Sequence, residues 1–287
     1  MLEVTTFARA ADFLAEAQTF LESNDAANGL IGGAALEACA RSSWLPDPRR
    51  WLLVHADGAR VMAAVALPDG RLASGPANAP EHARAFGAWC SARFSRKIAG
   101  PELCWQIVGP RETAEVFALG WLGRPAPMPS LRQILLTFSL LNKHYVTNPK
   151  FRKARPADVP LLRKWMREFD VEVGAIASQP PAEAWITPAI TRGDAYVYED
   201  AKGIPIATAS VGARTRLGGR IHLVYVDKSA RRCAAASSCV ASMAGVFANE
   251  GLCEATLFAG ADATAALALY TGLGFKPVAE FVELALE

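Results

Sequence analysis

Two adjacent arginines, Arg231 and Arg232, stand where a predicted strand gives way to a predicted helix. Small residues follow them, in the run ARRCAAAS at 230–237. A helix N-terminus attracts phosphate because it presents unpaired N–H groups and the positive end of its dipole. The amides of a turn add a nest for an anion, and guanidinium groups add charge-assisted hydrogen bonds. The stretch therefore predicts a phosphate-binding loop; the alternative is two solvated arginines ahead of an alanine-rich packing helix. The loop comprises Arg231, Arg232, Cys233, Ala234, Ala235, Ala236 and Ser237.

Composition limits the classes of protein that this chain can belong to. Its 287 residues are enough for two domains of ordinary size. Hydrophobic residues make up 52% of them, which is typical of a globular protein with a substantial core. The net charge of +2 argues against a nucleic-acid or acidic-membrane partner. The longest apolar run, 61–67, is far shorter than the roughly 20 residues of a membrane span. The acidic N-terminal stretch does not read as a signal peptide, and the 6 cysteines form no metal-binding pattern. We therefore expect a cytoplasmic protein with reduced thiols and no metal.

The second half of the chain alternates strand and helix patterns. Residues 157–171 predict a helix with Leu162, Trp165 and Met166 on one face. Residues 194–211 predict a hairpin that turns at Lys202-Gly203. The remaining predicted elements are strands at 151–155, 220–226, 254–258 and 278–286, helices at 234–250 and 263–273, and a possible further helix within 176–192. This order predicts an α/β fold with a mixed sheet.

The first half repeats much of the same order. A strand, an Asp57-Gly58 turn and a second strand at 51–67 correspond to the hairpin of the second half, and 108–114 correspond to 259–265. The polar stretch 140–150 is the predicted join. We therefore expect one fold in tandem, over 1–142 and 150–287.

Two local sequences of the second half carry a resemblance to a known family. The phrase Arg231-x-x-Ala234-x-Ala236 follows the predicted fourth strand, and the phrase ALYTGLGF occupies 268–275. They are similar to the cofactor loop, Arg/Gln-x-x-Gly-x-Gly/Ala, and to the last helix of the GNAT superfamily of acyl-CoA-dependent N-acetyltransferases. The resemblance covers 150–287 well and 1–140 faintly, so it implies a tandem GNAT-like fold with a degenerate N-terminal copy.

This resemblance implies acetyl-CoA as the cosubstrate, with its diphosphate on the phosphate-binding loop. It also implies that backbone groups of Val224, Tyr225 and Val226 bind the pantetheine arm and polarise the thioester carbonyl. Two residues depart from the family pattern, because Ala234 replaces a glycine and Leu267 replaces an asparagine. If the backbone at Ala234 is left-handed, the alanine costs roughly 1–2 kcal/mol.

Three side chains are candidates for the proton transfers that an acetyl transfer requires. Tyr270 matches the family's tyrosine that often protonates the leaving thiolate; it can also be an aromatic residue at the edge of the core. His222, two residues before Val224, and Glu172, at the end of the first helix, are candidate bases. They can equally be a half-exposed strand histidine and a solvated carboxylate.

Two classes of function stay open at this point. The first is an N-acetyltransferase acting on the amine of a small molecule, and the second is a GNAT-fold acyl-CoA-binding or regulatory module that has lost turnover. In both, acetyl-CoA is the expected ligand; nucleic acid and membrane are not expected partners, and the chain is expected to be a monomer or homodimer.

The equivalent of the phosphate-binding loop in the first half reads SGPANAPE at 74–81. Pro76 and Pro80 have no N–H to donate, and Glu81 would repel a diphosphate at the helix end that follows. We therefore expect only the second half to bind the cofactor.

Overall fold

The computed structural model describes residues 1–40, 49–94, 106–141, 148, 150–173, 183–232 and 234–287. The chain divides into two compact units. Unit 1 consists of Met1–Leu135, Ala213–Arg216 and Pro277–Glu287, and unit 2 of Leu136–Gly212 and Leu217–Lys276. Within the described residues, no helix is both long and apolar enough to cross a membrane.

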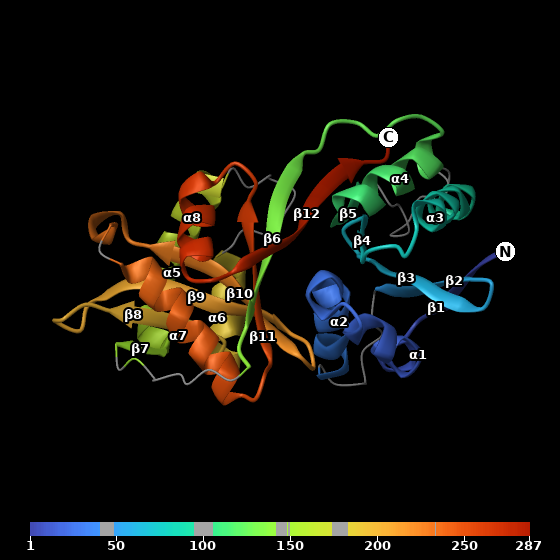
Figure 1. Cartoon of the computed structure of the whole chain (residues 1–287). Coiled ribbons are helices and arrows are strands. Elements are labelled where there is room, and N and C mark those ends of the chain that lie inside the picture. Colours follow the sequence, from blue (N-terminus) through green and yellow to red (C-terminus); the bar gives the residue numbers. More distant parts are fainter. Residues whose placement is uncertain (41–48, 95–105, 142–147, 149, 174–182, 233) are drawn as a thin grey trace. The chain divides into compact units, whose positions relative to one another are not determined.

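The order of elements repeats completely along the chain (Figure 1). Both halves read strand, two helices, three strands, helix, strand, helix, strand. The first half is β1 (Leu2–Phe7), α1 (Ala10–Glu22), α2 (Asp25–Ala40), β2 (Arg50–Ala56), β3 (Ala59–Ala66), β4 (Arg71–Ser74), α3 (Pro80–Arg93), β5 (Gln106–Pro110), α4 (Arg111–Leu122) and β6 (Leu131–Ser139). The second half is β7 (Phe151–Lys153), α5 (Val159–Val173), α6 (Glu183–Arg192), β8 (Ala195–Glu199), β9 (Pro205–Arg214), β10 (Gly218–Val226), α7 (Ala235–Asn249), β11 (Glu254–Gly260), α8 (Thr264–Gly272) and β12 (Lys276–Ala285), with short 3-10 turns at Pro156–Asp158 and Lys228–Ala230. The predicted elements of the second half are thus confirmed to within a few residues.

Unit 2 is built on the strand order β6-β11-β10-β9-β8-β7. The apolar face of α5 is buried, as its periodicity predicted, with Leu162, Trp165 and Met166 inaccessible to solvent. These side chains form one core with Leu223 and Tyr225 of β10. Helix α7 also packs on β10, since a Cβ added at Gly219 would lie 2.6 Å from the ring of Phe247.

Unit 1 has the strand order β1-β2-β3-β4-β5-β12-β6 and a core on each face of its sheet. Every apolar residue of the run Trp51–Val54 is buried, because helices cover both faces. Leu52 and Val54 lie in the core formed with α3 and α4, whereas Trp51 and Leu53 lie in the core formed with α1 and α2.

The last strand of each half contributes to the unit built from the other half. β12 pairs antiparallel with β5, from Phe281–Pro110 to Ala285–Gln106, and is therefore part of unit 1 (Figure 1). The end of β6, from Leu136 onward, belongs to unit 2, where Thr137 donates a hydrogen bond to Glu254 of β11. The predicted α/β fold with a mixed sheet is confirmed, while the domain bounds 1–142 and 150–287 stay a prediction about the sequence repeat.

Candidate functional site

The end of β10 separates from its parallel neighbour β11 in unit 2. The register between them runs from Gly218–Glu254 to Ile221–Leu257, and β10 then continues to Val226. Leu223 adopts φ +50°, an unusual value for a residue other than glycine, at the point of separation. The strand keeps its other neighbour, because Asp227 N–H donates to the carbonyl of Ile206 at 2.9 Å. Beside Val224 and Val226 the two parallel strands are thus no longer paired.

The loop after β10 leads into the N-terminus of α7 through left-handed backbone. Arg232 has φ +64°, and Ala234, the N-cap of α7, has φ +60° and ψ +7°. The first-turn N–H groups of Ala235, Ala236 and Ser237 precede the helix's own hydrogen-bond ladder. Of the predicted phosphate-binding residues, Cys233 lies outside the described part of the chain. The expected strand, basic loop and helix start are all present, and position 234 is left-handed.

Arg231 and Glu172 form an ion pair in this loop. One nitrogen of Arg231, Nη2, lies 2.7 and 2.8 Å from the two carboxylate oxygens of Glu172. Arg231 Nε also donates to the carbonyl of Val226 at 3.3 Å, and its guanidinium lies 5.5 Å from the ring centre of Tyr225. Lys228 Nζ lies 3.8 Å from Glu172. The structure therefore brings two predicted site residues from different classes, a phosphate ligand and a candidate base, into direct contact.

The start of the loop is held by Asp227. Its Oδ1 accepts hydrogen bonds from the N–H of Ser229 at 3.0 Å and from the Ser229 hydroxyl at 2.6 Å. Its Oδ2 accepts from the indole N–H of Trp165 at 2.8 Å. These bonds, the Ser229 hydroxyl foremost and then the indole, lower the pKa of Asp227 to about 2. Asp227 thereby ties the loop to α5.

The side chain of Tyr225 extends the same set of contacts. Its hydroxyl donates to Glu168 Oε2 at 2.7 Å. Burial, followed by the bond to Glu168, raises the pKa of the Tyr225 phenol above its ordinary range. Sequence reasoning assigned only the backbone of Tyr225 to the site and missed Trp165, Glu168 and Asp227. The i, i+4 spacing of Glu168 and Glu172 on one helix face was the signal that could have indicated Glu168.

Tyr270 lies on α8, and its ring centre is 6.3 Å from that of Phe275. Burial, with Cys239 of α7 as a lesser cause, raises the pKa of Tyr270 to about 12, so the phenol is protonated at neutral pH. Leu267, the residue in place of the family asparagine, is half-buried on the same helix. Tyr270 therefore carries the proton that a general acid needs. It lies near α7, the helix that follows the phosphate-binding loop.

His222 occupies the first position of β10 beyond the paired segment. Its side chain is exposed, unlike those of Ile221 and Leu223 on either side. The protein that surrounds the ring partly removes it from water, and this and, second, the charge of Arg220 lower the pKa of His222, so the imidazole is neutral at pH 7. The positive φ of Leu223 lies between His222 and Val224 and interrupts the regular alternation of the strand, so a common side for the two residues stays a prediction.

Comparisons with known proteins show which solved structures share this fold. No protein-family model and no curated protein matches the chain. Solved structures do match. A GCN5-related N-acetyltransferase from Sphaerobacter thermophilus matches with a TM-score of 0.61 at 18% identity, over 99% of this chain and 96% of that one. A GNAT-family acetyltransferase from Colwellia psychrerythraea matches with a TM-score of 0.57 at 12% identity, over 99% and 100%. A tandem GNAT protein from the clavulanic acid biosynthesis pathway matches with a TM-score of 0.55 at 14% identity, over 100% and 99%. The chain therefore has the fold of these GNAT-family acetyltransferases.

The GNAT fold occurs twice in the element order, but the equivalent place in unit 1 has a different geometry. β4 ends at Ser74, one residue beyond its last pair with β5, Ala73–Val108. The strands stay in contact there, since a Cβ at Gly109 would lie 3.0 Å from the carbonyl oxygen of Ser74. Two amides of the turn that follows already have hydrogen-bond partners within unit 1. Gly75 N–H donates to Ala63 O, and Ala77 N–H donates to Thr113 Oγ1, both at 3.0 Å.

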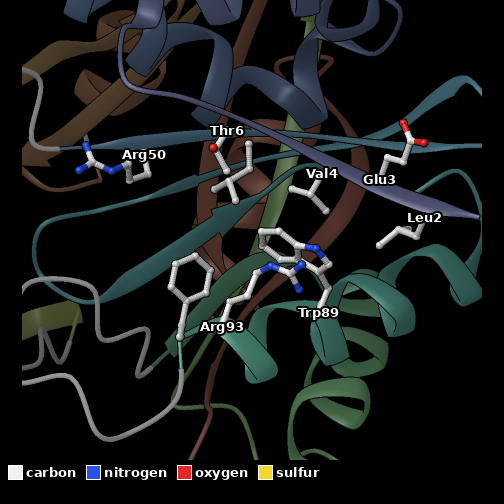
Figure 2. Close-up of a pocket in the computed structure, with 9 residues that line it drawn as sticks. Leu2, Glu3, Val4, Thr6, Arg50, Trp89 and Arg93 are labelled. Carbon is white, nitrogen blue, oxygen red and sulfur yellow. The ribbon is translucent and has the colours of Figure 1, made fainter.

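A separate pocket lies in unit 1, beside the edge strand β1 (Figure 2). Its volume is about 710 Å³. In this pocket the guanidinium of Arg93 lies 4.2 Å from the centre of the Trp89 ring. The pocket is lined by Leu2, Glu3, Val4, Thr6, Arg50, Leu52, Trp89, Arg93 and Phe94. None of the predicted site residues belongs to it.

Proposed function

We propose that this protein transfers an acetyl group from acetyl-CoA to the amine of a small molecule, at the site in unit 2. The observation that carries the proposal is the separation of β10 from β11 after Ile221–Leu257, directly ahead of a loop that opens α7. A strand end with backbone groups facing a gap suits an extended thioester arm, and a helix N-terminus suits a diphosphate. The GNAT fold of the solved structures supports this assignment.

The residues present fit a nucleotide diphosphate at the phosphate-binding loop. Ala234 is exposed, and the first-turn amides of Ala235 and Ala236 follow it, so small side chains leave the backbone approachable. Arg231 and Arg232 are both exposed and supply positive charge. When bound, acetyl-CoA supplies an activated acyl carbon. Amide groups of β10 at Val224–Val226 would align its carbonyl and stabilise the charge that develops on the carbonyl oxygen.

Two proton movements complete the proposed reaction. The amine nitrogen forms a bond to the acyl carbon, and the carbon–sulfur bond breaks. Tyr270 gives its proton to the departing sulfur, a role for which a phenol that is protonated at neutral pH is suited. The proton lost by the amine goes to His222, which is neutral and exposed, or to Glu172. Proton, acyl group and thiol are then all accounted for.

We assign unit 1 the role of a scaffold. The amides of Gly75 and Ala77, which correspond to those of the phosphate-binding loop, already have partners within unit 1. The strands β4 and β5 also stay close at Gly109, where β4 has already ended, whereas β10 continues for five residues beyond its last pair with β11. These contacts support the prediction of one cofactor per chain, which a calorimetric titration would test. The cytoplasmic location and the oligomeric state stay predictions.

The direct test is incubation of the purified chain with acetyl-CoA and a panel of primary amines. We expect release of CoA thiol, measured with a chromogenic thiol reagent, in equal amount to acetylated amine, measured by mass spectrometry. A Tyr270→Phe variant should bind acetyl-CoA and release thiol much more slowly. Absence of both binding and thiol release with the wild-type chain would contradict the proposal.

A second candidate function is an acyl-CoA-binding or regulatory module. It is favoured by one observation: an alanine rather than a glycine occupies the left-handed position 234, which strains the loop that must bind the diphosphate. Calorimetric binding of acetyl-CoA without thiol release for any amine is the result that would select this function over the transferase.

A further inference from the structure

The ion pair between Arg231 and Glu172 joins two groups that the proposed reaction needs separately. Arg231 is one of two exposed arginines just before α7 opens at Ala234, where the diphosphate is expected. Glu172 is a candidate group for the acceptor amine. Yet the guanidinium and the carboxylate are bound to one another, at 2.7 and 2.8 Å. One arginine nitrogen cannot serve the carboxylate and a diphosphate fully at the same time.

The strengths of the two competing interactions differ. Arg231 is 41% exposed and Glu172 is 37% exposed, and ion pairs of this exposure are weak because solvent screens them. A diphosphate carries more negative charge than one carboxylate and has more acceptor oxygens. It also gains the amides of α7, which Glu172 does not contact in the described residues. The diphosphate should therefore displace Glu172 from Arg231.

We propose that Glu172 is an internal competitor of the cofactor, and that cofactor binding releases its carboxylate for a cationic amine acceptor. This inference rests on the proposed function. In the free protein, Glu172 neutralises Arg231 and stands 3.8 Å from Lys228. In the complex, the carboxylate loses its strongest partner and becomes a site for an ammonium group. The acceptor site thus gains its negative charge only when the acyl donor is in place.

The loop does not depend on Glu172 for its shape. Asp227 holds its start through Trp165 and Ser229, at 2.6 to 3.0 Å. Arg231 has a further bond of its own, from Nε to the carbonyl of Val226. Replacing Glu172 by glutamine should therefore leave the fold and the loop intact, which makes the competition measurable.

The experiment is isothermal titration of the full chain with CoA and, separately, with pantetheine, which lacks the diphosphate. We expect Glu172→Gln to bind CoA about fivefold more tightly than the wild type, equivalent to about 1 kcal/mol, and to bind pantetheine unchanged. The matched control is Glu168→Gln, which removes an equal charge one turn earlier from a carboxylate that is bonded to Tyr225. It should change CoA affinity less than twofold.

A double-mutant cycle separates competition for Arg231 from a general charge effect. In an Arg231→Gln background, Glu172→Gln should give no further gain in CoA affinity, because the shared partner is gone. Equal or weaker CoA binding by Glu172→Gln, or the same gain in both backgrounds, would overturn the inference while leaving the transferase proposal standing. Absence of CoA binding by the wild type and by Glu172→Gln would overturn both.

Discussion

Replacing Ala234 by glycine should stabilise the protein. Ala234 has φ +60° and ψ +7°, a left-handed conformation that costs a residue with a Cβ roughly 1–2 kcal/mol. Its methyl group is exposed, so removing it opens no cavity. Glycine also gives the unfolded chain more conformational entropy, and this cancels roughly 0.4–1 kcal/mol of the stability gained by relieving the strain. The net expectation is an increase in the free energy of unfolding of about 0.5–1 kcal/mol.

The matched control is Ala241→Gly, an identical chemical change at an exposed position within the same helix, α7. There the backbone is helical and glycine should destabilise by about 1 kcal/mol. Urea unfolding followed by circular dichroism gives both midpoints. We expect a higher midpoint for Ala234→Gly and a lower one for Ala241→Gly. If both variants unfold at lower urea than the wild type, the left-handed backbone at position 234 carries no strain and the reasoning is refuted.

Three further predictions concern the site. Tyr270→Phe should lower kcat for acetyl transfer by ~10²-fold with acetyl-CoA affinity nearly unchanged, since only a proton donor is lost; wild-type turnover would make Tyr270 purely structural. Arg231→Glu should weaken CoA binding by tenfold or more but leave pantetheine binding unaltered, and equal losses for both ligands would contradict a diphosphate contact. Asp227 has a depressed pKa of about 2, so it should stabilise the fold above about pH 4 and lose this effect as the pH falls towards 2. Urea unfolding midpoints of wild type and Asp227→Asn should therefore differ at pH 5 and converge near pH 2, and a difference that does not change with pH would refute this.

The sequence could predict elements whose own residues determine them. The spacing of Leu162, Trp165 and Met166 indicated α5, and the turn at Lys202-Gly203 indicated a hairpin, and both are present. Helix α2 was not predicted. It carries glycines that disfavour a helix, but Gly33 is used for close packing, since a Cβ there would lie 2.7 Å from that of Ala213.

The site was predictable only in part, because only some of its features are determined by residues that are neighbours in the sequence. The order of strand, arginine pair and small residues lies in one continuous segment, so it could be recognised. The positive φ of Leu223 could not, because leucine rarely adopts it. The contact of Arg231 with Glu172 joins residues 59 positions apart, and no local pattern specifies which carboxylate meets which cation.

The place of β12 in unit 1, beside β5 of the first half, affects how the protein can fold while it is being synthesised. The strand supplies Val282 and Leu284, and the residue after its end supplies Leu286, to a core that otherwise consists of residues from the first half. The indole of Trp121 donates to the carbonyl of Leu286 across 165 residues of chain. During translation, β5 therefore leaves the ribosome long before its neighbour exists, and its edge must stay unpaired until the second half has been made. A nascent chain in this state exposes a strand edge of the kind that chaperones shield and that seeds aggregation. Truncation just after residue 276 should therefore destabilise the core of the first half before that of the second, although the residues removed lie at the opposite end of the sequence.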